Sequence, residues 1–191
     1  MPNTPTQPYQ ASKRETLPSA MHAAPGASLL FLREDELRAA QDMLFFALRD
    51  LNSPADSILA EMKFGRAHHR CLHWIARRPN LNVGELLSIL GITKQSLTRV
   101  LGPLIRDGYV TQVPGPKDRR QRLLTLTEKG AMLERRLFET QRERLLTAYR
   151  EAGGPAVEGF KRVMRGLIGP GGRAYLETSE PPRLPKPPRS A

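Results

Sequence analysis

The stretch from Thr93 to Arg106 carries polar and basic side chains at helical spacing. At 100° per residue one side of this segment is polar, and it consists of Gln95, Arg99, Gly102 and Arg106, flanked by Lys94, Ser96 and Thr98. No acidic residue follows Glu85 until Asp107, so nothing on this side repels phosphate. Glutamine and arginine can form bidentate hydrogen bonds with the edges of adenine and guanine in a DNA major groove.

The other side of this segment is apolar, and it consists of Leu97, Val100, Leu101, Leu104 and Ile105. This pattern predicts a helix with one buried face and one free face. An ordinary amphipathic surface helix has the same pattern, so the alternative stays open. Because Pro103 lacks the amide that would bond to the Arg99 carbonyl, and Gly102 precedes it, we expect a kink or an early loosening there.

A second basic cluster lies between two predicted strands, Tyr109–Val113 and Arg122–Leu126. The connecting loop contains Lys117, Arg119 and Arg120 beside proline and glycine residues. We expect a hairpin whose basic tip could enter a narrow minor groove.

Three histidines and the single cysteine share one predicted helix. His69 and His73 are four residues apart, a spacing that can bind zinc or contact haem, and His68 and Cys71 lie beside them. Two residues do not complete a metal site, so the sequence predicts no metal and no cofactor, and a metal or haem sensor stays open as an alternative. The three histidines could instead line an effector site, or could serve only packing and hydrogen bonding. Cys71 fits a small buried side chain better than a redox switch.

The elements before the polar helix follow from apolar spacing and capping residues. A helix begins after Arg33, and Ser53-Pro54 is expected to break it before a short turn over Ala55–Met62. Further helices are predicted over Arg66–Arg77 and Val83–Leu90. Only Gly91 and Ile92 separate the helix Val83–Leu90 from Thr93, which can cap the polar helix. These two helices therefore have the spacing of a helix-turn-helix.

Two helices are predicted after the hairpin. Thr127 caps a long helix that reaches about Arg150, and Gly153-Gly154-Pro155 ends it. A last amphipathic helix then extends to Ile168.

The net charge of +11 is concentrated in the centre of the chain. Residues 63–130 carry 13 basic and 4 acidic side chains, whereas residues 34–62 carry 2 and 7. This uneven distribution of charge favours a single surface that binds a polyanion over a protein that is basic all round. A basic face that is only solvated would have the same composition.

Proline marks the ends of the folded part, with five of 17 in the first 25 residues and six in the last 22. We expect disordered tails at 1–32 and 170–191 and a folded domain at 33–169. Neither a membrane-spanning run nor a signal peptide is apparent, so we expect a cytoplasmic protein without a membrane partner.

Several motifs resemble the MarR family of winged helix-turn-helix transcriptional regulators. Asp118–Thr127 matches the family's wing pattern D-x-R-x-x-x-[LV]-x-L-T and continues into Glu128-Lys129-Gly130. Leu90–Leu101 resembles the turn and recognition helix, and Leu104–Val110 resembles the exit into the wing. The resemblance covers about Leu37 to Ile168 and implies a mainly α fold with a small β-hairpin wing.

The resemblance also implies a homodimer that presents two recognition helices to double-stranded DNA. The DNA-binding part would cover about 63–127, and the dimerisation helices about 34–60 and 128–169. Arg120 would enter the minor groove with Asp118 bracing it, and a small-molecule effector would bind near His68, His69 and His73. The expected DNA-binding residues are Thr93, Lys94, Gln95, Ser96, Thr98, Arg99, Lys117, Arg119 and Arg120. Further phosphate contacts are expected from Lys63, Arg66, Arg70, Arg77 and Arg78.

The sequence bears on three classes of function. A sequence-specific regulator that binds a pseudo-palindromic operator is favoured by the Gln95 and Arg99 face. A non-specific architectural or nucleoid-associated protein could use the same winged helix. An enzyme is not expected, since the sequence has no nucleophile elbow, phosphate-binding glycine loop, H-E-x-x-H or paired CxxC.

Overall fold

The computed structural model describes residues 33–116 and 118–178. Lys117 and the predicted tail segments 1–32 and 179–191 lie outside the described residues. The chain divides into two units, one up to Met43 and one from Leu44 onwards. In the first unit, the described residues Glu34–Met43 form the beginning of a helix, where Arg38 pairs with Glu34.

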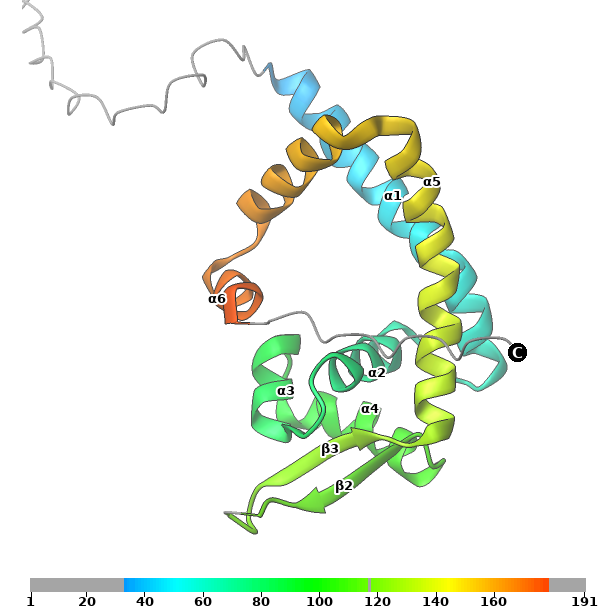
Figure 1. Cartoon of the computed structure of the whole chain (residues 1–191), viewed down its shortest axis with the longest axis vertical. Helices are drawn as coiled ribbons and strands as arrows, with labels where there is room; N and C mark the ends of the chain where they lie inside the picture. The colour runs from blue at the N-terminus through cyan, green and yellow to red at the C-terminus, as the bar shows by residue number, and fades with distance from the viewer. Residues whose placement is uncertain (1–32, 117, 179–191) are drawn as a thin grey trace, which may run out of the picture. The chain divides into compact units, whose positions relative to one another are not determined.

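The described residues are mainly helical and include a three-stranded antiparallel sheet (Figure 1). In chain order the elements are α1 (Glu34–Glu61), α2 (Arg66–Arg77), β1 (Leu81–Asn82), α3 (Val83–Leu90), α4 (Lys94–Arg106), β2 (Val110–Pro114), β3 (Arg122–Leu126), α5 (Glu128–Leu167) and α6 (Pro170–Thr178). This is the predicted class, a mainly α fold with a β-hairpin wing.

Helix α1 continues through Pro54 to Glu61, so the predicted break at Ser53-Pro54 was wrong. Pro54 has no N–H to donate to the Asp50 carbonyl, which costs the helix one bond. Ala55 and Leu59, both 0% exposed, anchor the following turn in the hydrophobic core. Tertiary packing of this turn therefore outweighs the local effect of the proline.

The helix-turn-helix forms where the capping residues predict it. Asn82 Oδ1 accepts a hydrogen bond from the Glu85 amide, and Glu85 Oε2 accepts one from the Asn82 amide, both at 2.9 Å. Gly91 then closes α3 with a φ of 62°, a left-handed conformation that glycine adopts without strain. After this turn Thr93 Oγ1 accepts from the Ser96 amide and starts α4.

Helix α4 continues through Gly102 and Pro103 to Arg106, so it does not loosen early. Leu101 and Leu104 are 6% and 0% exposed on either side of these residues. Their burial holds this part of the segment in the helix.

The sheet has the order β1-β3-β2. Strand β3 has the predicted bounds, whereas β2 is shifted by one residue from the predicted Tyr109–Val113. The short strand β1 was not predicted, and Leu81 pairs there with Leu124. Two residues are too few to show an alternation of apolar and polar side chains.

Helix α5 starts against the sheet and bends at Gly153. Thr127 Oγ1 accepts the Gly130 amide at 3.0 Å and donates to the Gly108 carbonyl at 2.7 Å. Gly153 has φ 76° and ψ 164°, which separates the predicted long helix from the final one. The predicted end of the long helix at this glycine is thus confirmed.

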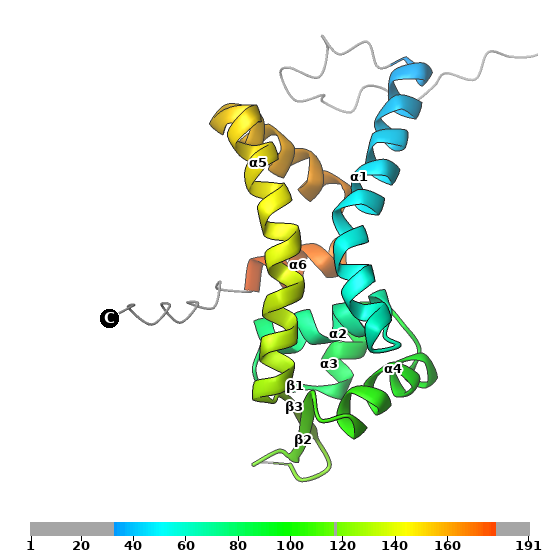
Figure 2. The same ribbon diagram turned by 90° about the vertical axis from the view of Figure 1, so that its right-hand side faces the viewer.

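The hydrophobic core is built around α2. Cys71, Leu72 and Ile75 of this helix are at most 1% exposed, and α2 packs against α3, α4, α5 and β3. Figure 2 shows α2 and α3 behind the lower part of α5, with α4 and the wing below them. This packing fixes α4 and the wing at the same end of the second unit.

Residues 170–178 form helix α6, so the prediction of a disordered tail from residue 170 was wrong for this stretch. Tyr175 of α6 packs edge-on against Trp74 of α2, with ring centroids 4.9 Å apart. This aromatic contact stabilises α6 by tertiary packing. The proline and glycine content of the segment gave no sign of such a contact.

Gly130 gives a direct test of this packing. A Cβ atom at Gly130 would lie 2.0 Å from the Tyr109 carbonyl oxygen, so α5 could not approach the backbone just before β2 as it does. We expect Gly130→Ala to lower the free energy of unfolding by about 1–3 kcal/mol, measured by urea denaturation. Gly159→Ala, where a Cβ meets nothing within 4 Å, should instead be neutral or stabilising. Equal stabilities of the two variants would contradict this account.

Candidate nucleic-acid interface

Helix α4 presents its polar side to solvent. The predicted contact residues on and before this helix are all exposed: Thr93, Lys94, Gln95, Ser96, Thr98 and Arg99. Leu97, Leu101 and Leu104 lie on the opposite side and are 1%, 6% and 0% exposed. The structure therefore brings the predicted α4 residues together on one accessible face.

Some hydroxyl groups on this face already make local hydrogen bonds. Thr93 Oγ1 lies 3.0 Å from Ser96 Oγ, and the Thr98 hydroxyl donates to the Lys94 carbonyl at 2.9 Å. Since these hydroxyl groups are partly engaged in holding the helix start, Gln95 and Arg99 remain the face's main groups for bidentate recognition.

The C-terminal end of α4 carries an ion pair. Arg106 Nε donates to Asp107 Oδ1 at 2.8 Å, and this hydrogen bond lowers the pKa of the Asp107 carboxyl. The Lys129 ammonium donates to the Asp107 carbonyl at 2.9 Å and lies over the Tyr109 ring. The Arg106 guanidinium is therefore held by its neighbour Asp107, whereas Arg99 lies about two helical turns earlier.

The wing tip is shaped by backbone hydrogen bonds. Asp118 Oδ1 accepts the Arg120 amide at 2.9 Å, and the Asp118 carbonyl accepts the Gln121 amide at 3.0 Å. A Cβ on Gly115 would lie 2.9 Å from the Asp118 carbonyl oxygen, so the turn closes tightly on a glycine. Asp118 thus holds the backbone that carries Arg119 and Arg120, whose side chains are exposed. The predicted contact Lys117 lies outside the described residues.

The wing and α4 lie at the same end of the second unit, and a residue that the sequence did not single out lies between them there. Gln112 of β2 lines a shallow hollow of about 200 Å³ together with Lys94 and Thr98 of α4. Gln112 pairs with Leu124 in the sheet and is exposed. The alternation of inward and outward side chains along β2 could have identified Gln112 as exposed. Its position beside α4 could be known only from the fold.

The five basic residues predicted to contact phosphate differ in their surroundings. Lys63, Arg70 and Arg77 are exposed. The Arg66 guanidinium is paired with Asp56 at 2.7 Å, and the Arg78 guanidinium lies 4.1 Å from the Tyr175 ring centroid. Arg66 and Arg78 are therefore engaged by other parts of the chain.

The three histidines of α2 have separate environments. The His68 ring stacks on Phe64 at 4.7 Å, and its Nδ1 accepts the Gly65 amide at 3.1 Å. Accepting this hydrogen bond requires the lone pair of a neutral ring. Burial lowers the pKa of His68 from its ordinary value.

His69 and His73 face the neighbouring helices. Burial lowers the pKa of His69, and repulsion from His73 adds to that effect. His73 Nδ1 lies 3.7 Å from Glu134 of α5. Within residues 33–116 and 118–178, no group of three histidine, cysteine or acidic side chains is arranged to hold a metal ion.

Cys71 is 0% exposed, and burial raises the pKa of its thiol to about 12. The thiolate is the reactive form of cysteine, so this side chain serves packing in the core.

A family model described as MarR family matches residues 64–121, which include α2, the helix-turn-helix and the wing tip. The chain is also 49% identical over 152 residues to the HTH-type transcriptional regulator PetP of Rhodobacter capsulatus, covering 80% of this chain and 92% of that protein. The chain belongs to the MarR family. It is a MarR-type transcriptional regulator with a DNA-binding fold, as its motifs predict.

Solved MarR structures share this fold at low sequence identity. A mutant MarR from E. coli complexed with operator DNA has a TM-score of 0.56 and 19% identity, covering 71% of this chain and 97% of that chain. A MarR protein from Peptoclostridium difficile has a TM-score of 0.57 and 21% identity, covering 78% and 92%. In the described part of this MarR-family chain, none of the helices has the length and apolar character needed to cross a bilayer.

The histidine environments predict a pH effect on stability. His68 and His69 bind protons more weakly in the folded chain than in the unfolded chain. The free energy of unfolding should therefore fall as the pH drops through about 6.5, the ordinary histidine pKa, and continue to fall until the folded pKa values are passed. Above that range both states hold neutral rings and the effect vanishes.

We expect the double variant His68→Gln with His69→Gln to lose less stability than the unsubstituted chain between about pH 7.5 and 5.5, measured by urea denaturation. Carboxylates that titrate in both proteins cancel in this comparison. An equal or larger loss of stability in the double variant would show that folding does not lower the pKa values of His68 and His69.

Proposed function

We propose that this MarR-family chain is a sequence-specific regulator that binds a pseudo-palindromic operator in double-stranded DNA as a homodimer. The carrying observation is the outward polar face of α4, which contains Gln95 and Arg99 and no acid. These two side chains lie one helical turn apart on exposed positions, so both can reach base edges in one major groove. The operator complex of the similar E. coli MarR supports placing this face on DNA.

The wing supplies the second proposed contact. Arg119 and Arg120 project from a turn that Asp118 holds through the Arg120 amide. An arginine inserted in a narrow minor groove meets a strongly negative potential. We assign Arg120 to this contact and keep Arg119 as a second DNA contact of the wing, together with Lys117, which is proposed from the sequence alone. Phosphate contacts are assigned to the exposed Lys63, Arg70 and Arg77.

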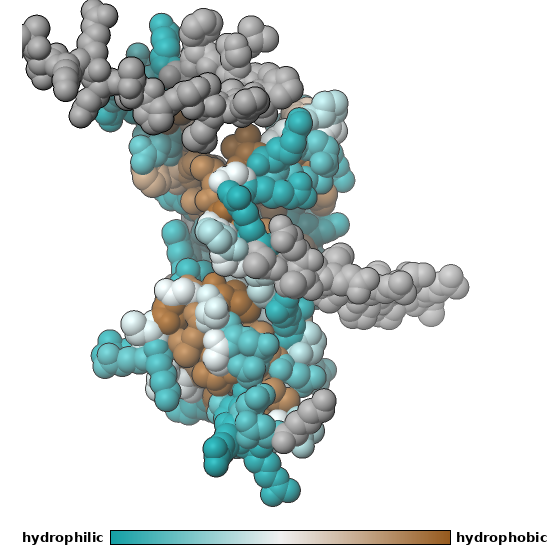
Figure 3. Space-filling view, turned by 90° about the vertical axis from the view of Figure 1, so that its left-hand side faces the viewer, coloured by the Kyte–Doolittle hydropathy of each residue, from teal (hydrophilic) through white to brown (hydrophobic). Residues whose placement is uncertain are grey.

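Exposed apolar side chains on α1 and late α5 support the homodimer. They are Leu37, Met43, Phe45, Phe46 and Leu48 of α1, and Phe160, Val163 and Leu167 of α5. Each is 46% exposed or more, and Figure 3 shows hydrophobic residues on the surface of the described chain. A monomer rarely leaves so many large apolar residues in water, so a second copy is the proposed cover. Two α4 helices then read half-sites about 34–36 Å apart.

A response to a small-molecule effector is the remaining part of the proposal. His68, His69 and His73 lie on α2, the helix at the centre of the DNA-binding core, and His73 approaches α5. A molecule that bound these rings would contact both the core and the helix that leads away from it.

Arg99→Ala tests the direct reading of bases. We expect this variant to lose about 1–3 kcal/mol of binding free energy on the selected operator and to accept other bases at one position of each half-site. Fluorescence anisotropy with operator and with random-sequence DNA of the same length would measure both effects. Affinity for the random duplex should fall only by the small amount expected from the loss of one positive charge.

The matched control is Arg106→Ala, which removes the same charge from an exposed position of the same helix that is already paired with Asp107. It should lower affinity for operator and random DNA by similar small amounts. If Arg99→Ala behaved in the same way, Arg99 would contact only the backbone, and a non-specific architectural role would become the better description.

A further inference from the structure

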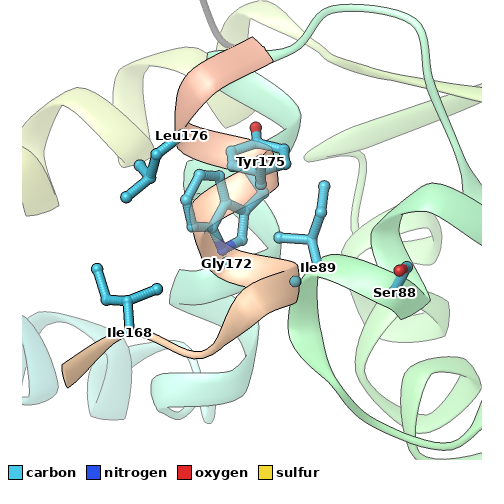
Figure 4. Close-up of a pocket in the computed structure, with 8 residues that line it drawn as sticks. Ser88, Ile89, Ile168, Gly172, Tyr175 and Leu176 are labelled. Atoms are coloured by element: carbon cyan, nitrogen blue, oxygen red, sulfur yellow. The ribbon is translucent and has the colours of Figure 1, made fainter. Parts of the chain in front are cut away.

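The shallow hollow between α4 and β2 has no role in the proposed contacts with base edges and the minor groove. Its lining residues include Lys94, Leu97, Thr98, Leu101 and Gly102 of α4 and Gln112 of β2. Figure 2 shows α4 and the hairpin together at the lower end of the second unit. The hollow shares no residue with the larger apolar cavity between α2, α3 and α6, which Figure 4 shows in close-up. It is therefore a separate feature of the surface.

The proposed complex with DNA brings a strand to this place. Adjacent major and minor grooves are separated by one sugar–phosphate backbone. If α4 lies in a major groove and Arg120 of the same subunit enters the neighbouring minor groove, that backbone must pass between the helix and the hairpin. The hollow lies between α4 and β2, on that path.

The side chain of Gln112 lies on the face of the sheet that packs against the core. Alternate residues of a strand share a face, so Gln112 lies on the same face as Val110, which is 2% exposed. Its cross-strand partner Leu124 is 0% exposed. Gln112 is closer to the wing tip, beyond the edge of the core, and is exposed. Among the described residues its carboxamide has no hydrogen-bond partner, so both of its N–H groups are available.

The rim of the hollow also carries a positive charge. Lys94 is exposed at the start of α4, and no acidic side chain in the described part of the chain pairs with it. The Thr98 hydroxyl donates its proton to the Lys94 carbonyl at 2.9 Å, so it has none to offer an anion. None of the described residues that line the hollow is acidic. The free donors are therefore a lysine ammonium and a glutamine amide, and both suit a phosphate oxygen.

Gly102 leaves the surface of α4 open beside the hollow. It is exposed, and a Cβ atom there would meet nothing within 4 Å, so packing does not require a glycine. Glycine is one of the least favourable residues inside a helix. Its value is that another molecule can approach the helix backbone closely. No described residue of the chain occupies that space, so it is available to a bound molecule.

We propose that the hollow holds the sugar–phosphate backbone that separates the two grooves. Gln112 and Lys94 donate hydrogen bonds to phosphate oxygens, and Gly102 lets the strand approach α4. The inference rests on the proposed DNA complex and adds residues that set how deeply α4 enters the groove. Since every duplex has the same backbone, this contact is independent of base sequence.

Gln112→Leu tests the hydrogen bond from the amide. Fluorescence anisotropy would measure binding to two duplexes of equal length, one made only of A·T pairs and one only of G·C pairs, over a range of salt concentrations. We expect this variant to bind both duplexes about three- to tenfold more weakly. The salt dependence should stay the same, because a neutral amide displaces no counterion from the phosphate. Lys94→Gln should weaken binding and also reduce the salt slope by about 1 for each bound copy.

Gly102→Leu tests the close approach of the strand. Leucine favours a helix, so this variant should unfold at a higher urea concentration than the unsubstituted chain. It should nevertheless bind both duplexes at least about tenfold more weakly, because its side chain fills the space of the backbone. Gly159→Leu makes the same change at a helical position outside the hollow where a Cβ atom also meets nothing within 4 Å. This control should gain stability and keep its affinity.

Unchanged affinity of either Gln112→Leu or Gly102→Leu for both duplexes would overturn the proposal. A loss confined to one duplex would also overturn it, because Gln112 would then contact a base. The measurement needs no operator sequence. A chain that binds both duplexes but selects no sequence would therefore fail the operator proposal alone, whereas a chain that binds neither duplex would overturn both.

Discussion

The burial of one side of α4 fixes what the other side can do. Leu97, Leu101 and Leu104 are packed among α2 and β2, and each fully buried leucine contributes about 1.5–3 kcal/mol. Turning the helix by a single residue would rotate these side chains by 100° and expose them. Arg99 is held in solvent by the leucines behind it, and the direction of the recognition face follows from core packing.

Local hydrogen bonds set the position of this face along the chain. The Asn82–Glu85 capping box starts α3, Gly91 turns the chain and Thr93 starts α4, so the recognition helix begins at a fixed point of the turn. The wing is placed differently, because the Asp118 carboxylate bonds to a backbone amide instead of to a side chain. The loop is thereby shaped without using the arginines that it carries. The capping hydrogen bonds of the helix-turn-helix and the Asp118 hydrogen bond of the wing both leave basic side chains available to bind a polyanion.

Sequence patterns predicted most of the fold because its elements are amphipathic and have strong end signals. The bounds of α2, α3, α4 and β3 and the bend at Gly153 follow from apolar spacing, capping residues and glycine. The errors arise where tertiary packing decides. Pro54 was expected to break α1, but the burial of Ala55 and Leu59 stabilises the helix beyond it. Helix α6 forms because Tyr175 packs against Trp74. The polar face of α4 could be recognised as a pattern in the sequence. Its neighbour Gln112 could not be assigned to that face, because only the fold brings β2 beside α4. The cavity between α2, α3 and α6 is likewise lined by residues that are far apart in the sequence.

In the proposed complex, two copies of the α4 face read specific bases. Selection of duplexes from a random pool by the full chain, followed by sequencing, tests it most directly. We expect an enriched inverted repeat whose half-site centres lie about 10–10.5 base pairs apart or at a multiple of that spacing. A bound pool that shows no enriched sequence, or a single unpaired half-site, would contradict it.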